Sequence, residues 1–136
     1  NDITAVIGLA ELKVLDEHNL TRREIAQKYN KAFKDIDWIE TPVEKDYAYS
    51  ARHNYVVKVP MRNELNEYLR ISGISTGVHY EPIHHYKVFG NIKADVPNTE
   101  KVWPKLLTLP LYPDMTEEEF EKVVSEMIEF GKAHSL

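Results

Sequence analysis

An α+β fold is predicted for this chain by three features of its sequence. Apolar residues recur every three or four positions near both ends, which is typical of helices with one buried face. A run rich in β-branched and aromatic residues, 53–59, is typical of a strand. The elements between them alternate, so we expect a small sheet of three to four short, mainly antiparallel strands packed with four to five helices.

Two helices are predicted in the first 35 residues. The first starts at Asn1 or Asp2, either of which can cap its first turn, and its apolar face carries Ile3, Ile7, Ala10 and Val14. Thr21 followed by Glu24 is a capping-box pattern, so a second helix is expected to begin there. It ends at 35–37, and its apolar face carries Ile25, Ala26, Tyr29 and Phe33. Its charged side chains are expected to form a solvated face of Arg22, Arg23, Glu24 and Lys28.

The strongest strand prediction is 53–59, which Pro60 closes. A second, very short strand is predicted at 38–39, before Pro42. Residues 74–80 are expected to return as a third strand. The last is an edge strand at 107–112, because the sheet tolerates Pro110 only at an edge.

Four further helical segments follow the first long strand. Residues 62–71 form a helix with Gly73 just beyond its end as a C-cap, and 83–89 form a short helical turn. A helix over 97–106 must end or bend at Pro104, and 90–96 is expected to be a loop. The run 116–119 caps a final helix, whose apolar face carries Phe120, Val123, Val124, Met127, Ile128 and Phe130.

Composition limits the possible functions. The 136 residues have the length of one domain, and 43% hydrophobic residues suffice for a core. The formal net charge is −5 and the basic residues are spread along the chain, which argues against a nucleic acid or a membrane surface as a partner. The chain has no cysteine, so disulfides and thiolate chemistry are excluded. No apolar run approaches the roughly 20 residues of a membrane helix, and a cytoplasmic location is expected.

The segment 76–86 concentrates three of the six histidines and two of the eight tyrosines. It is predicted to be a strand that runs into a loop, where imidazole and phenol groups are suited to binding. His79, Tyr80 and His84 are the first candidates, although backbone hydrogen bonds would equally explain His79 and Tyr80 as structural residues. A metal site is a competing interpretation of the histidines. Since Glu81 is the one nearby carboxylate, no metal is predicted.

Several segments together resemble one family. They are Asn1–Gly8, Arg22–Tyr29, Ser50–Val57, Gly73–His84, Asn98–Glu100 and Leu107–Pro113. In order and spacing they are similar to the C-terminal part of the DegT/DnrJ/StrS sugar aminotransferases. These are fold-type-I enzymes that use pyridoxal phosphate to aminate keto-sugars attached to nucleotides, and they serve pathways such as polysaccharide biosynthesis.

The resemblance implies that most of the chemistry lies in residues outside this chain. It implies a C-terminal fragment in which 1–35 is a helical link to a missing large domain and 36–136 is the small domain. The large domain would carry the lysine that binds pyridoxal phosphate, and no lysine here stands three residues after a serine as in the family motif. Neither catalytic nor cofactor-binding residues are therefore expected in this chain, and the fragment alone should be inactive.

The resemblance also implies a role for the small domain in binding substrate. His79, Tyr80 and His84 would contact the nucleotide-sugar, with Arg52 and His53 as second candidates for an anionic group. Glutamate is the expected amino donor, and the full-length enzyme is expected to be a homodimer. The alternatives are a non-catalytic nucleotide-sugar-binding or oligomerisation module derived from the same domain, and a histidine-based metalloprotein.

Overall fold

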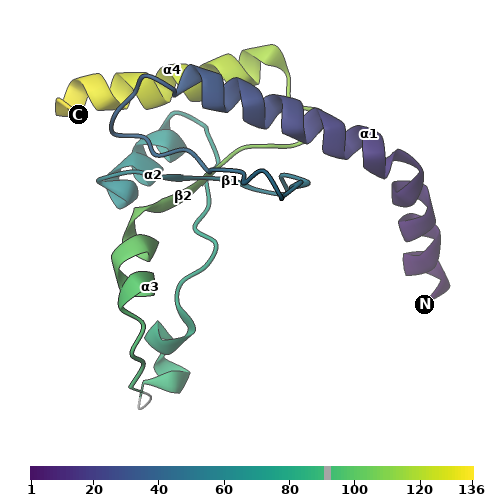
Figure 1. Cartoon of the computed structure of the whole chain (residues 1–136), viewed down its shortest axis with the longest axis horizontal. Helices are drawn as coiled ribbons and strands as arrows, with labels where there is room; N and C mark the ends of the chain where they lie inside the picture. The colour runs from purple at the N-terminus through teal and green to yellow at the C-terminus, as the bar shows by residue number, and fades with distance from the viewer. Residues whose placement is uncertain (91–92) are drawn as a thin grey trace.

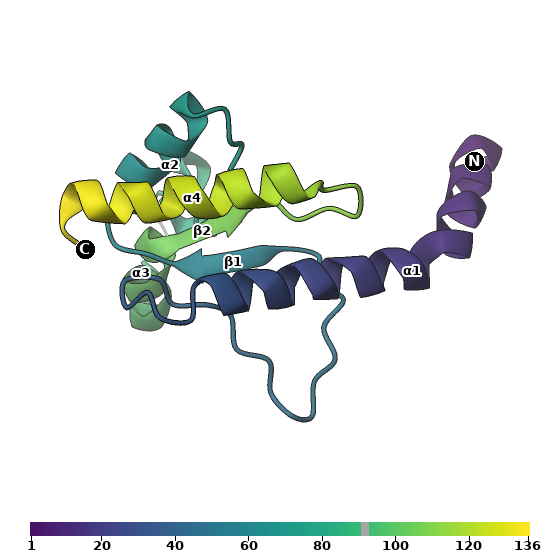
Figure 2. The ribbon, with the colours of Figure 1, turned by 90° about the horizontal axis from the view of Figure 1, so that it is seen from above.

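The helices and strands of the chain form a body and a projecting arm (Figure 1). The computed structural model describes residues 1–90 and 93–136, so two residues of the predicted 90–96 loop lie outside the described part. In the body, the C-terminal half of α1 (Asp2–Ala32) and α4 (Glu117–His134) run side by side over the small sheet. Figure 2 shows these two helices from above, with β1 visible between them.

The first 32 residues form a single helix instead of the two predicted. Asn1 caps α1 as expected, because its side-chain oxygen accepts a hydrogen bond from the amide of Thr4 at 3.0 Å. The prediction of a second start at Thr21 was wrong. The Thr21 hydroxyl donates to the carbonyl of Glu17 at 3.1 Å, which lets a threonine lie inside a helix. No glycine or proline lies between Leu9 and Ala32 to interrupt the helix.

The sheet consists of β1 (Tyr55–Lys58) and β2 (Leu106–Leu109), which are antiparallel, with Tyr55 opposite Leu109. Single bridges extend it on both sides, from Glu40 to Lys58 and from Gly77 to Thr108. The strand predicted at 74–80 is therefore reduced to one bridge, at Gly77. The strand predicted at 38–39 is absent, and the bridge falls on the next residue, Glu40. The strand predicted at 107–112 stops at Leu109, because Pro110 has no amide hydrogen to donate. Its prediction as an edge strand was wrong, because Thr108 also bridges to Gly77 on the side away from β1.

The predicted caps of the later helices are confirmed. α2 (Arg62–Ile71) ends in a Schellman arrangement: the Ile74 amide donates to the Leu69 carbonyl at 2.8 Å and the Gly73 amide to the Arg70 carbonyl at 3.1 Å. Gly73 has φ +79°, a conformation that favours glycine. α4 begins with the predicted capping box of Thr116 and Glu119.

Stacked aromatic rings form the centre of the body. The ring of Tyr29 lies 4.8 Å from that of Tyr55 and 4.8 Å from that of Phe120, and all of its surface is buried. Its hydroxyl donates to the Pro110 carbonyl at 3.0 Å. Burial raises the pKa of Tyr29, since the charged form would lose its hydration. Aromatic packing therefore joins α1, β1 and α4 in one core.

The arm is the stretch 77–105, which leaves the sheet at Gly77 and returns to it at β2. It contains two 3₁₀ turns, η1 (Ile83–His85) and η2 (Lys87–Phe89), then α3 (Pro97–Val102) and a third 3₁₀ turn, η3 (Trp103–Lys105). The helix ends before Pro104, as predicted. α3 stops at Val102, and Trp103–Lys105 form the 3₁₀ turn η3. No residue of the described parts of the arm, 77–90 and 93–105, is fully buried. Figure 1 shows the arm extending away from the helices of the body.

Candidate functional site

The five predicted binding residues fall into two regions of the molecule. His79, Tyr80 and His84 lie on the arm, whereas Arg52 and His53 directly precede β1. Within the described residues, the hydrogen bonds and ion pairs of Arg52 are with the 44–50 loop, and those of His84 are with the arm. The two regions therefore have to be considered as separate sites in this chain.

His79 is held in place from two sides. Its Nδ1 lies 2.9 Å from the hydroxyl of Thr108 on β2. Its ring lies against Gly77, where an added Cβ would be only 2.4 Å from the His79 Cε1 atom. Glycine at position 77 therefore leaves the room that the imidazole occupies. The ring of Tyr80 meets the His79 ring edge-on, with centroids 5.0 Å apart.

Tyr80 presents its phenol to solvent. It is 76% exposed and lies at the edge of a shallow hollow of about 380 Å³. The other residues that line this hollow are Pro82, Asn98, Thr99, Val102, Trp103 and Leu106. A fixed imidazole beside an exposed phenol offers hydrogen bonds to a polar ligand, which is the role predicted for this pair.

The imidazole of His84 is hydrogen-bonded to a neighbouring carboxylate. Its Nε2 lies 2.5 Å from Oε1 of Glu100, and Nε2 of His85 lies 2.8 Å from the same oxygen. The hydrogen bonds from His84 and then His85 lower the pKa of Glu100 below its ordinary value. Sequence reasoning missed Glu100, because it is 16 residues from His84 and on another element. The contact joins η1 to α3 and holds the two sides of the arm together.

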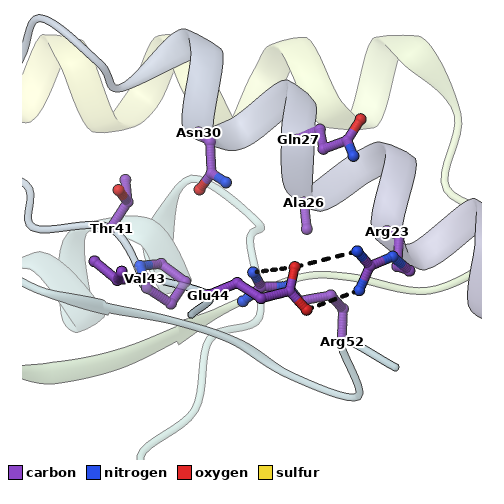
Figure 3. Close-up of a pocket in the computed structure, with 9 residues that line it drawn as sticks. Arg23, Ala26, Gln27, Asn30, Thr41, Val43, Glu44 and Arg52 are labelled. Atoms are coloured by element: carbon purple, nitrogen blue, oxygen red, sulfur yellow. Dashed lines mark hydrogen bonds and ion pairs between the residues drawn. The ribbon is translucent and has the colours of Figure 1, made fainter. Parts of the chain in front are cut away.

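The second region is a pocket of about 370 Å³ beside α1, with a carboxylate between two guanidinium groups (Figure 3). Arg23 donates two hydrogen bonds to Glu44, at 2.9 and 3.1 Å, and a third to the Ser50 carbonyl at 2.6 Å. Arg52 lies 3.4 Å from the other side of Glu44. The amide of Ser50 also donates to Glu44 at 2.6 Å. The network joins the 44–52 loop to the body.

Hydrogen bonds from charged and polar neighbours, which outweigh the effect of partial burial, explain the state of Glu44. The side chains of Arg23, Glu44 and Arg52 are 15%, 23% and 11% exposed. The hydrogen bonds from Arg23 and then from the Ser50 amide lower the pKa of Glu44 to about 2, so the carboxylate stays ionised. The two arginines exceed the one carboxylate by a single positive charge. Gln27, Asn30 and Thr41 add polar groups to the lining.

Two predictions for this region need correction or restriction. Arg23 was expected on a solvated face, and this was wrong, because it is paired with Glu44 and also lies 3.8 Å from the ring centroid of Tyr49. Arg52 faces the pocket, but part of its guanidinium is already engaged by Glu44. His53 is exposed beside it.

Comparison with known proteins identifies the family. The model of the DegT/DnrJ/EryC1/StrS aminotransferase family matches residues 1–128 of the 136. The chain belongs to this family. The predicted resemblance is thereby confirmed, and so is the α+β class, with four α-helices and a small antiparallel sheet in the described part of the chain.

Individual proteins are similar to this chain along almost its whole length. The spore coat polysaccharide biosynthesis protein SpsC of Bacillus subtilis is 34% identical over 96% of this chain. The aminotransferase TlmJ from Streptoalloteichus hindustanus superposes on all of it with a TM-score of 0.93 and 27% identity. Spr1654 from Streptococcus pneumoniae, a candidate sugar aminotransferase in its PLP form, superposes on 98% with a TM-score of 0.89 and 25% identity.

This chain spans little more than a third of those proteins. It covers 36% of SpsC, 38% of the TlmJ chain and 36% of the Spr1654 chain. None of the helices in residues 1–90 and 93–136 combines the length and apolar character needed to cross a membrane.

Proposed function

We propose that these residues are the C-terminal part of a pyridoxal-phosphate-dependent aminotransferase that moves an amino group from glutamate to a nucleotide-linked keto-sugar. The observation that carries the proposal is the family match over residues 1–128. The name of SpsC and the PLP form of Spr1654 support the sugar and the cofactor. Residues 1–35 would connect to the large domain, and 36–136 would form the small domain.

The residues of this chain do not fit the cofactor's attachment site. A lysine that forms a Schiff base is activated by burial or by neighbouring cations. No lysine in the described part of the chain is buried. The two that are partly buried, Lys28 and Lys58, are paired with Glu117 and Glu40. We therefore assign the cofactor to residues outside these 136, and the chain by itself would be inactive.

The part played by this chain would be to bind substrate. His79, whose ring is held by Thr108, and the exposed phenol of Tyr80 would donate or accept hydrogen bonds with sugar hydroxyls or the diphosphate. Arg52 and His53 would bind an anionic group only through the donors that Glu44 leaves unused. His84 would act indirectly, by holding the arm through Glu100. The exposed apolar side chains of the first half of α1 are a suitable surface for the expected homodimer.

The cofactor assignment can be tested by colour. A longer polypeptide that ends with these 136 residues should turn yellow with pyridoxal phosphate, and glutamate should bleach it. The 136-residue chain alone should stay colourless under the same conditions. A colourless longer polypeptide at saturating cofactor would contradict the proposal. Tight binding of a nucleotide-sugar by the isolated chain would instead favour the non-catalytic binding module.

The substrate role can be tested in the longer polypeptide with Tyr80→Phe. Loss of one hydrogen bond is worth about 1 kcal/mol, so the KM for the nucleotide-sugar should rise roughly fivefold while the yellow colour is kept. Tyr47→Phe is the matched control, since Tyr47 is 91% exposed on the 44–52 loop. Equal KM values for the two variants would show that the Tyr80 hydroxyl does not bind the nucleotide-sugar.

A further inference from the structure

Three side chains that can bind a metal converge on one point of the arm. His84 and His85 are adjacent on η1, and Glu100 comes from α3 on the other side of the arm. One ligand atom from each of the three lies within 4.8 Å of the others. We propose that His84 Nε2, His85 Nε2 and a carboxylate oxygen of Glu100 form a binding site for one divalent transition-metal ion of the Zn²⁺ class.

The donor set is suited to this ion. Two imidazoles and one carboxylate are a set found in zinc sites that keep a fourth position for water. Ligand atoms in a tetrahedral zinc site lie roughly 3.3 Å apart, given bonds of about 2.0–2.1 Å. The present distances from Glu100 Oε1 are 2.5 Å to His84 Nε2 and 2.8 Å to His85 Nε2. Glu100 Oε1 therefore has to separate from each histidine nitrogen by less than about 1 Å.

The side chains have room for this movement. Those of His84, His85 and Glu100 are 22%, 25% and 46% exposed, so an ion can enter from solvent and no core packing resists the shift. The ring of Trp103 lies edge-on to that of His85, with centroids 5.0 Å apart. Trp103 therefore packs against the His85 ring, whereas Glu100 is the most exposed of the three side chains.

A second carboxylate, that of Glu81, lies near Nδ1 of His85 but outside hydrogen-bond distance. A histidine that binds metal through Nε2 carries its hydrogen on Nδ1, and a nearby carboxylate stabilises this form. Nδ1 of His85 lies 4.0 Å from Oε1 of Glu81. On binding, a neutral imidazole moves its hydrogen from Nε2 to Nδ1, whereas a protonated one releases a proton to solvent.

This site does not depend on the proposed transferase function. Sequence reasoning considered Glu81 as the one available carboxylate, whereas the fold supplies Glu100 as well. The metal would link η1 to α3 more strongly than the hydrogen bonds do, in a region whose described residues are all at least partly exposed. Its effect would be to order the arm that carries His79 and Tyr80.

The test uses the 136-residue chain with any affinity tag removed, because a histidine tag would itself bind metal. Calorimetry with Zn²⁺ should give one site per chain, and Co²⁺ in its place should give the visible absorption of a tetrahedral ion. His84→Ala and Glu100→Gln should weaken Zn²⁺ binding by at least roughly tenfold. His18→Ala, a histidine on α1 remote from the arm, is the matched control and should bind as the wild type does.

One further variant tests whether Glu100 acts as a metal ligand or only as a hydrogen-bond acceptor. Glu100→His removes the carboxylate but supplies a third imidazole, so it should retain Zn²⁺ binding that Glu100→Gln loses. Circular dichroism of each variant checks that the helices are intact. The proposal is overturned if the wild type shows no saturable Zn²⁺ binding at millimolar metal, or if His84→Ala, Glu100→Gln and His18→Ala all bind alike. In either case the three residues form a hydrogen-bonded contact alone.

Discussion

The body and the arm of this molecule are held together in different ways. The body has a continuous core in which Tyr29, Leu65 and Met127 have no exposed surface. The arm, in its described residues 77–90 and 93–105, has no fully buried residue. Hydrophobic burial therefore stabilises the body, whereas the arm depends on polar contacts such as that of His84 with Glu100. His79 and Tyr80, which are proposed to bind substrate, lie on the part with less internal stability, as is common for binding loops.

The charged network around Glu44 in the body and the one around Glu100 in the arm also differ. Glu44 is held between two permanently charged arginines with at most 15% of either side chain exposed. Glu100 is nearly half exposed, and its partners are histidines, whose charge depends on pH. The first network keeps its charges across the physiological range. The second can exchange its hydrogen bonds for a metal ion.

The largest loss of stability is expected from truncating a side chain in the core of the body. Phe130 is 1% exposed and packs against Tyr68, with ring centroids 5.4 Å apart. Phe130→Ala should lower the free energy of unfolding by about 3–5 kcal/mol, measured by urea denaturation. Val88→Ala on the arm is the control, because Val88 is 81% exposed and its truncation should change little. Similar losses in both variants would show that the arm has a core of its own.

A smaller change in the free energy of unfolding is expected from the Glu44 network, and it should depend on pH. The pKa of Glu44 is lowered from 4.5 to about 2, so its contribution is present above pH 4.5 and is lost as the pH falls towards 2. The unfolding free energy of the wild type should therefore fall more steeply between pH 5 and pH 2 than that of Glu44→Gln. Glu118→Gln, on the exposed first turn of α4, should keep the wild-type slope. Parallel curves for all three proteins would mean that the Arg23–Glu44 contact does not persist in solution.

The smallest effect on stability is expected in the arm. In His84→Ala without metal, the urea midpoint should be almost unchanged, because no core packing is lost. Amide hydrogen exchange should nevertheless become faster within 83–90 and 97–103, since the contact with Glu100 is removed. His18→Ala provides the comparison for exchange as well. A large loss of global stability in His84→Ala would instead place the arm within the cooperative unit of the body.

Short-range patterns in the sequence determined several local features correctly. The strand at 55–58 was predicted from its β-branched and aromatic residues, although its hydrogen-bond partner β2 is distant in the sequence. The capping box at Thr116 and the glycine C-cap at Gly73 depend on interactions within a few residues. Such windows carry their own hydrogen bonds and steric limits, so they can be predicted without the fold. The failure at Thr21 has the same origin, because a local capping pattern cannot show that the helix continues through it.

What only the tertiary structure decided are the contacts between distant segments. Glu44 and Arg23 are 21 residues apart, and Glu100 and His84 are 16 apart, so no local pattern pairs them. Their distances depend on how the sheet brings the 44–52 loop against α1 and how the arm folds back to β2. The sequence by itself determined the family, the α+β class and the residue types available for binding. The fold decided which of those residues are free for a ligand and which are held by a charged neighbour, because packing brings those neighbours together.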